Sequence, residues 1–225
     1  MPHQLTLVII TIVATALVAL IVILRNPKSE IAQSFAVLIS FFVLWAALQG
    51  FIFISSSAEQ TYVAELLTNY LGLGIAWSFL IFAYFFPYKS YRIERGQVVF
   101  LAGATILMFI LMSIPGFIID ITQPWHHGLA LPANKINFAL YILLFSLIFG
   151  NAYQILIKKF LVSTAENKIL LLHVIYSSAV PVIAGSILNL LLIEFDEFRY
   201  QIYGPSFTLF FTLTVAYLIF IRRER

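Results

Sequence analysis

Long apolar stretches separated by short polar segments repeat along the whole chain. A helix that crosses the hydrocarbon core of a bilayer needs about 20 mainly apolar residues. Seven stretches meet this requirement, so the pattern predicts an all-α membrane protein built as a seven-transmembrane helix bundle. Because the intervening segments are short, we expect residues 1–225 to form a single seven-helix domain. The expected helices cover residues 5–24, 31–54, 61–86, 98–119, 137–157, 168–193 and 204–221.

Composition supports a membrane protein and excludes several kinds of chemistry. Apolar residues make up 62% of the 225 residues and charged residues only 10%, whereas soluble domains carry about 25% charged residues. The mean hydropathy is +1.00. The chain has no cysteine, which removes disulfides, thiolate catalysis and sulfur-ligated metals. The lipid bilayer is therefore the first partner that the sequence predicts.

The basic residues predict the orientation of the bundle. Lys and Arg concentrate in the cytoplasmic loops of membrane proteins, and only Lys135 and Arg199 fall on the opposite side here. We therefore expect the amino terminus outside and the carboxy terminus in the cytoplasm. Since these charges are spread over short loops, we expect no nucleic-acid partner. The other eleven of the 13 basic residues are Arg25, Lys28, Lys89, Arg92, Arg95, Lys158, Lys159, Lys168, Arg222, Arg223 and Arg225.

Polar residues inside the expected spans are the best indication of a binding site, because each is unfavourable in lipid unless it has a partner. Glu65 and Asn69 are four residues apart and share one face of a helix. Together with an aromatic rim from Tyr62 and Tyr70, they predict a small outward-facing pocket. Alternatively, these residues lie at wet helix ends and only contact headgroups or water. The expected ligand-binding residues are Gln49, Glu65, Asn69, Trp125 and Asn189.

The sequence gives little support for a metal site, a cofactor site or retinal binding. His3, Asp120, His126 and His127 could meet outside the membrane, but adjacent histidines in a loop are more typical of solvent-facing positions. All six lysines lie in expected loops or at helix ends, so no interior lysine is expected to form a retinal Schiff base. We expect no metal and no other cofactor.

One expected helix carries a proline in its middle. Pro181 removes a backbone hydrogen bond and clashes with the preceding turn, which predicts a kink. Small residues flank it at 177–178 and 184–186, and they would let a neighbouring helix approach closely. The kink can serve as a moving part or as a static packing feature.

The chain resembles the seven-helix amino-terminal sensor region of bacterial sensory histidine kinases. The resemblance covers nearly the whole chain and implies a multi-pass location in a bacterial-type cytoplasmic membrane. It implies a receptor module without kinase activity, because no ATP-binding segment or phospho-accepting histidine region is present in this sequence. The residues that carry it are Ser34-Phe35-Ala36 and Trp45, Phe82-Ala83-Tyr84-Phe85-Phe86-Pro87, Asn189 before leucines, Gly204-Pro205, and Ala216-Tyr217 before Arg222 and Arg223.

The sequence thus favours a membrane-embedded sensor for signal transduction. The expected partners are a small-molecule, lipid or peptide ligand and a cytoplasmic signalling protein or an output domain outside this chain. The alternative is a small transporter or channel, although no charged residue lies in the centre of an expected span. A membrane-embedded enzyme is the third class, and the sequence offers no convincing catalytic set for it.

Overall fold

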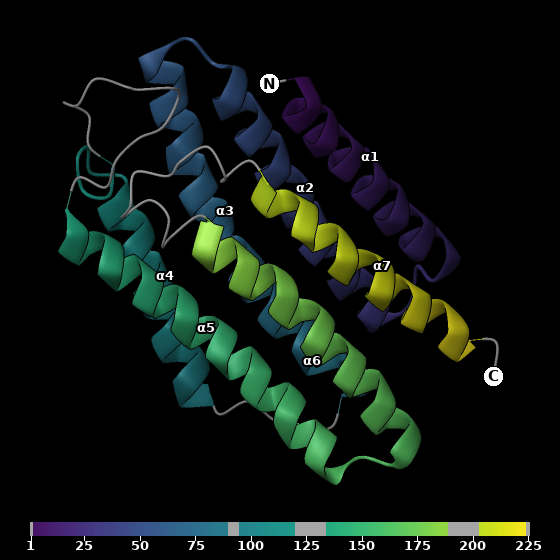
Figure 1. The fold of residues 1–225 in the computed structure, drawn as a ribbon. Helices are drawn as coiled ribbons and strands as arrows, with labels where there is room; N and C mark the ends of the chain where they lie inside the picture. Colours follow the sequence, from purple (N-terminus) through teal and green to yellow (C-terminus); the bar gives the residue numbers. More distant parts are fainter. Residues whose placement is uncertain (1, 90–94, 120–133, 189–202, 224–225) are drawn as a thin grey trace.

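The computed structural model describes residues 2–89, 95–119, 134–188 and 203–223, and these residues form helices with no β-strand among them. Side chains are described for the same residues apart from Pro2 and residues 220–223. The helices are α1 (Pro2–Arg25), α2 (Glu30–Ile54), α3 (Ala58–Phe85), α4 (Arg95–Met112), α5 (Lys135–Val162), α6 (Ala165–Ser186) and α7 (Gly204–Arg223) (Figure 1).

Six of the described helices, α1 to α6, are long and apolar enough to cross a membrane. The apolar part of α7, Gly204–Ile219, is shorter than the other six. The all-helical class and a multi-pass membrane protein therefore follow from the structure. A seventh span, and the side of the membrane that each terminus faces, remain predictions.

The first and last helices lie side by side in the bundle. Both α1 and α7 pack against α2, and α7 also packs against α6. Because α1 and α7 run in the same direction, α1 begins at one end of the bundle and α7 ends at the other (Figure 1). Helix α3 packs against both α2 and α5, and α4 lies at the edge against α3 and α5.

Polar side chains define where several helices begin. Ser29 accepts a hydrogen bond from the amide of Ala32 at the start of α2, and Ser57 does the same for Gln60 at the start of α3. Such caps satisfy amides that have no partner within the helix. The two capped helices therefore start before the predicted apolar stretches, α2 at Glu30 rather than at residue 31 and α3 at Ala58 rather than at residue 61.

One helix ends earlier than the hydropathy pattern predicts. Helix α4 ends at Met112 rather than at residue 119. Pro115 has no amide donor, and Gly116 adopts a φ of 78°, a conformation that favours glycine. Residues 113–119 therefore form a turn in place of further helix, and Ile118 and Ile119 are buried in the core. Helix α6 is α-helical to Ser186 and continues as a π-helical turn at residues 187–188, and residues 189–193 of the predicted helix are outside the described residues.

A glycine on α3 allows a close contact with α2. A Cβ atom on Gly74 would overlap the ring of Phe41 on α2, so this glycine lets α2 and α3 approach closely. Small residues serve this purpose in membrane bundles, where lipid is as apolar as a protein interior.

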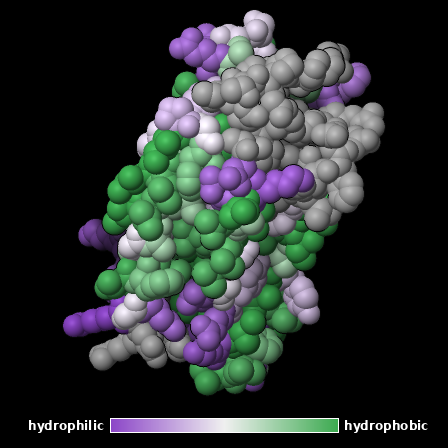
Figure 2. Space-filling view, turned by 90° about the vertical axis from the view of Figure 1, so that its left-hand side faces the viewer, coloured by the Kyte–Doolittle hydropathy of each residue, from purple (hydrophilic) through white to green (hydrophobic). Residues whose placement is uncertain are grey.

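Large apolar side chains remain on the outside of the bundle, with Ile10 54% and Leu24 69% exposed. Figure 2 shows hydrophobic side chains over much of one face.

Candidate functional site

A cavity lies inside the bundle and is lined by side chains from α2, α3, α5, α6 and α7 and by Ile118 and Ile119 of the segment after α4. Its volume is about 150 Å³, far more than the roughly 10–15 Å³ that one water needs. Its lining on α3 runs from Glu65 to Phe79, a length of about 21 Å at about 1.5 Å per residue. The cavity is therefore elongated and follows the axis of the bundle.

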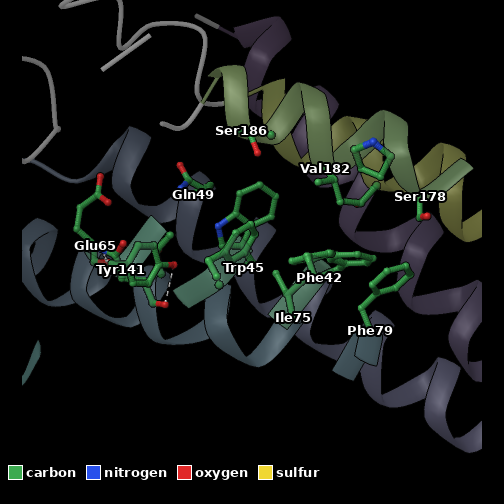
Figure 3. A pocket seen from close by; sticks show the side chains of 18 of the residues that line it. Phe42, Trp45, Gln49, Glu65, Ile75, Phe79, Tyr141, Ser178, Val182 and Ser186 are labelled. Carbon is green, nitrogen blue, oxygen red and sulfur yellow. Dashed lines mark hydrogen bonds between the residues drawn. The ribbon is translucent and has the colours of Figure 1, made fainter. Parts of the chain in front are cut away.

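The two ends of the cavity differ in polarity. Figure 3 shows Glu65 and Gln49 at one end, and Phe79 and Ser178 at the other. The Glu65 end lies near the carboxyl end of α2 and the amino ends of α3 and α5. This is the end of the bundle at which α1 begins. The cavity thus combines a polar head region with a mainly aromatic body.

Glu65 and Gln49 are two polar residues whose side chains have no described partner. The side chain of Gln49 is only 5% exposed, and Glu65 is partly buried. Among the described residues, neither the Glu65 carboxylate nor the Gln49 amide takes part in a hydrogen bond or ion pair. A buried polar group without a partner is unfavourable. Both side chains can therefore interact with a molecule that enters the cavity.

Asn69 anchors the polar end through its backbone and side chain. Its Nδ2 donates to the carbonyl oxygen of Glu65 at 2.9 Å. The Tyr141 hydroxyl of α5 donates to the carbonyl oxygen of Asn69 at 3.1 Å. A Cβ atom on Gly72 would overlap that hydroxyl, so the glycine makes the α3–α5 bond possible. The three expected residues Gln49, Glu65 and Asn69 thus line one cavity.

A row of rings on α5 forms one wall. Phe138, Tyr141, Phe145 and Phe149 recur every three or four residues and share a helix face. Phe145 and Phe149 have ring centroids 4.7 Å apart, and Phe149 stacks on Phe79 of α3 at 5.3 Å. Their spacing was visible in the sequence, but their helix face could not be assigned because this helix is apolar all round.

Phe211 of α7 closes the aromatic end. It is 1% exposed and makes ring contacts with Phe35, Phe42, Phe79 and Phe82 at centroid distances of 6.4, 6.1, 6.1 and 6.3 Å. These rings belong to α2 and α3, so Phe211 connects α7 to both. Since Phe211 also lines the cavity, a molecule bound there would contact α7 directly.

Helix α6 lines the cavity with the segment around its internal proline. Pro181, Val182, Gly185 and Ser186 all face the cavity. Ser178, one turn earlier, accepts a hydrogen bond of 3.0 Å from the Tyr153 hydroxyl of α5. The proline pattern in the sequence pointed to this segment, but the sequence alone did not connect it with Glu65.

The other expected site residues are either outside the described residues or away from the cavity. Trp125 and Asn189 are outside the described residues, as are Asp120, His126 and His127. Tyr62 and Tyr70 do not line the cavity, so the predicted aromatic rim was wrong for these two. The Tyr70 hydroxyl instead bonds the Ser113 hydroxyl at 2.8 Å and the Phe109 carbonyl oxygen at 3.1 Å. It joins α3 to the end of α4.

Lys159 has a role that the sequence did not predict. The orientation argument placed it in a loop, but it lies inside α5 and is 1% exposed. Its Nζ donates to the carbonyl oxygens of Ala83, Tyr84, Phe86 and Tyr88 at 3.0, 2.6, 2.9 and 2.7 Å. An ammonium has three protons, so at least one is shared. Lys159 therefore caps the carboxyl end of α3.

Comparison with known proteins does not identify the function of the cavity. No family model, curated protein or solved structure matches this chain. The resemblance to sensory histidine kinases therefore remains a prediction that rests on the quoted residues. The chemistry of the cavity is that of an aromatic space with one polar end.

Proposed function

We propose that the chain is a membrane-embedded receptor for signal transduction and that the cavity is its ligand site. The observation that carries this proposal is the position of Phe211, which lines the cavity and packs against both α2 and α3. A ligand that fills the space beside Phe211 changes the packing of α7. Helix α7 ends at the opposite end of the bundle from Glu65, so it can carry that change across the membrane.

The proposed direction of signalling follows the charge distribution. The polar end of the cavity lies at the end where α1 begins, and Arg25, Lys28 and Lys168 lie at the other end. If the basic end faces the cytoplasm, as Lys and Arg in short loops favour, then the ligand enters from outside. The movement of α7 then reaches a cytoplasmic partner or output domain.

A transporter, the alternative class, would need a route from the cavity to the basic end. In the part of the chain that the structure describes, buried rings occupy the region beyond Phe79. Phe35, Phe82 and Phe86 are all at most 2% exposed, and Phe82 contacts both Phe35 and Phe86 at 5.9 and 5.2 Å. This packing favours a site that opens at one end, which suits a receptor better than a transporter.

The experiment uses the absence of cysteine in the native chain, because spin labels then attach only where cysteines are introduced. Leu161→Cys and Tyr217→Cys place labels on the exposed faces of α5 and α7. The protein in lipid nanodiscs is titrated with phenethylammonium, phenethyl alcohol and phenylacetate. We expect at least one compound to shift the distance between the labels, and Ile75→Trp, which fills the cavity, to abolish the shift.

Two results would contradict the receptor proposal. A compound that binds in the cavity without any change between α5 and α7 would leave no signal to transmit. Accumulation of the same compound inside proteoliposomes would indicate transport instead. If none of the three compounds bound, the cavity would lose its assignment as a ligand site for small aromatic molecules.

A further inference from the structure

Charge and hydrogen-bonding capacity at the polar end of the cavity define the chemistry of the molecule that fits it. Glu65 is the only charged residue in the described lining, and no Lys, Arg or His joins it there. A carboxylate in apolar surroundings is unfavourable unless a cation or hydrogen-bond donor accompanies it. Because the described residues supply no such partner, the missing partner can come from the ligand.

Several donor hydrogens near Glu65 are already used within the protein. The Asn69 amide donates to the Glu65 carbonyl oxygen, the Thr68 hydroxyl to Ala64 and the Tyr141 hydroxyl to Asn69, all to backbone carbonyl oxygens. The two hydroxyls can then only accept further hydrogen bonds, whereas the Asn69 amide keeps one N–H to donate. Among the described lining residues, the donors still available at this end, on Gln49, Trp45 and Asn69, are neutral. From the described residues, an anionic ligand would therefore meet one carboxylate and no cation.

The walls beside Glu65 suit a cation as well. Trp45, Phe138 and Tyr141 line the same region. Ring faces attract cations through their electron density, most strongly for Trp, when the cation lies within about 6 Å of the ring centre. Phe138 and Tyr141 stack at 6.2 Å with an angle of 11° between their planes. Beyond them, Phe145, Phe149 and Phe79 offer an apolar region for the ligand body.

We infer that the cavity, taken as the ligand site proposed above, binds an organic cation. Its ammonium group lies between the Glu65 carboxylate and the Gln49 amide oxygen. Its apolar body, preferably aromatic, extends between the ring wall of α5 and the segment around Pro181 of α6. Neutral and anionic molecules of the same shape bind more weakly.

The test compares three probes of one shape and different charge. Calorimetry measures the affinity of wild-type protein in phosphatidylcholine nanodiscs for phenethylammonium, phenethyl alcohol and phenylacetate, with empty discs subtracted. We expect the ammonium to bind at least about tenfold more tightly than the alcohol, and the carboxylate not to bind. The zwitterionic lipid avoids attraction of the cation to the membrane itself.

Two matched variants locate the effect. Glu65→Gln keeps the shape of the side chain and removes its charge, so it should weaken ammonium binding about tenfold and leave the alcohol nearly unchanged. Glu59→Gln is the control, because Glu59 lies on the same helix but is exposed and does not line the cavity. Thermal unfolding of both variants verifies that the fold persists.

The outcomes separate the ligand class from the receptor function. The inference is overturned if the alcohol or the carboxylate binds as tightly as the ammonium, if the ammonium does not bind, or if Glu59→Gln weakens binding as much as Glu65→Gln. If the alcohol binds best and still shifts α7, the cation is wrong and the receptor stands. If the ammonium binds best without shifting α7, the cation stands and the receptor function falls.

Discussion

The Lys159 ammonium of α5 donates a hydrogen bond of 2.6 Å to the carbonyl oxygen of Tyr84, in the last turn of α3. The final carbonyl groups of a helix have no partner within it. In lipid, such groups are strongly unfavourable. The buried Lys159 ammonium therefore satisfies the last carbonyl groups of a helix that is far away in the sequence. It also links α3 to α5 beyond the Phe79 end of the cavity.

Replacement of Lys159 tests this cap. Lys159→Met keeps the length and apolar stem of the side chain but leaves four carbonyl oxygens without their donor. We expect a loss of about 2–3 kcal/mol of stability, because hydrogen bonds to a charged group are strong and desolvation of the lysine offsets part of the gain. Thermal unfolding in mild detergent measures it. Lys28→Met, at an exposed lysine between α1 and α2, should change the melting temperature little, and an equal loss there would reject the cap.

Glycine at position 72 should matter for the contact between α3 and α5. Gly72→Leu places side-chain atoms where the Tyr141 hydroxyl lies and breaks its bond to Asn69. We expect a destabilisation of about 1–3 kcal/mol from overpacking, measured as a lower melting temperature. Gly103→Ala on α4 meets no atom within 4 Å and should stabilise the helix by up to about 1 kcal/mol. A Gly72→Leu protein as stable as wild type would show that this close approach is not required.

Phe211 should couple the cavity to α7. Phe211→Leu keeps an apolar side chain but removes ring contacts with Phe42 and Phe79. We expect this variant to bind a cavity ligand with an affinity within about threefold of wild type, and to lose most of the distance change between labels at residues 161 and 217. A full distance change in Phe211→Leu would place the coupling elsewhere.

Reporter fusions test the orientation of the bundle. The concentration of basic residues at one end predicts that residue 225 faces the cytoplasm. A phosphatase that is active only in the periplasm should be inactive when fused there, and a fluorescent protein that matures in the cytoplasm should fluoresce. The reverse pattern would mean that either the number of spans or their direction is wrong.

The fold class could be predicted because hydropathy over about 20 residues is a local property of the chain. Helix ends were harder to place, because hydropathy does not register caps such as Ser57 or the turn at Pro115 and Gly116. Glu65 and Asn69 could be assigned to one face from their spacing alone. The expected pocket therefore included side chains that do line the cavity.

Contacts between distant helices could not be predicted in the same way. Lys159 looks like any basic residue that follows an apolar stretch, and its carbonyl partners at residues 83–88 are backbone groups that leave no mark in the sequence. Likewise, nothing local distinguishes Phe211 from the other 21 phenylalanines of the chain. Only the arrangement of helices identifies which ring closes the cavity.

The place of α7 in the bundle also sets the order in which the cavity can be assembled. Thr208 and Phe211 of α7 form part of its lining, and α7 leaves the ribosome after the other six helices. Until it arrives, the faces of α2 and α3 around Phe42 and Phe79 lie open to lipid. A nascent chain therefore holds a groove that acyl chains can occupy, and insertion of α7 must displace them to complete the lining of the cavity.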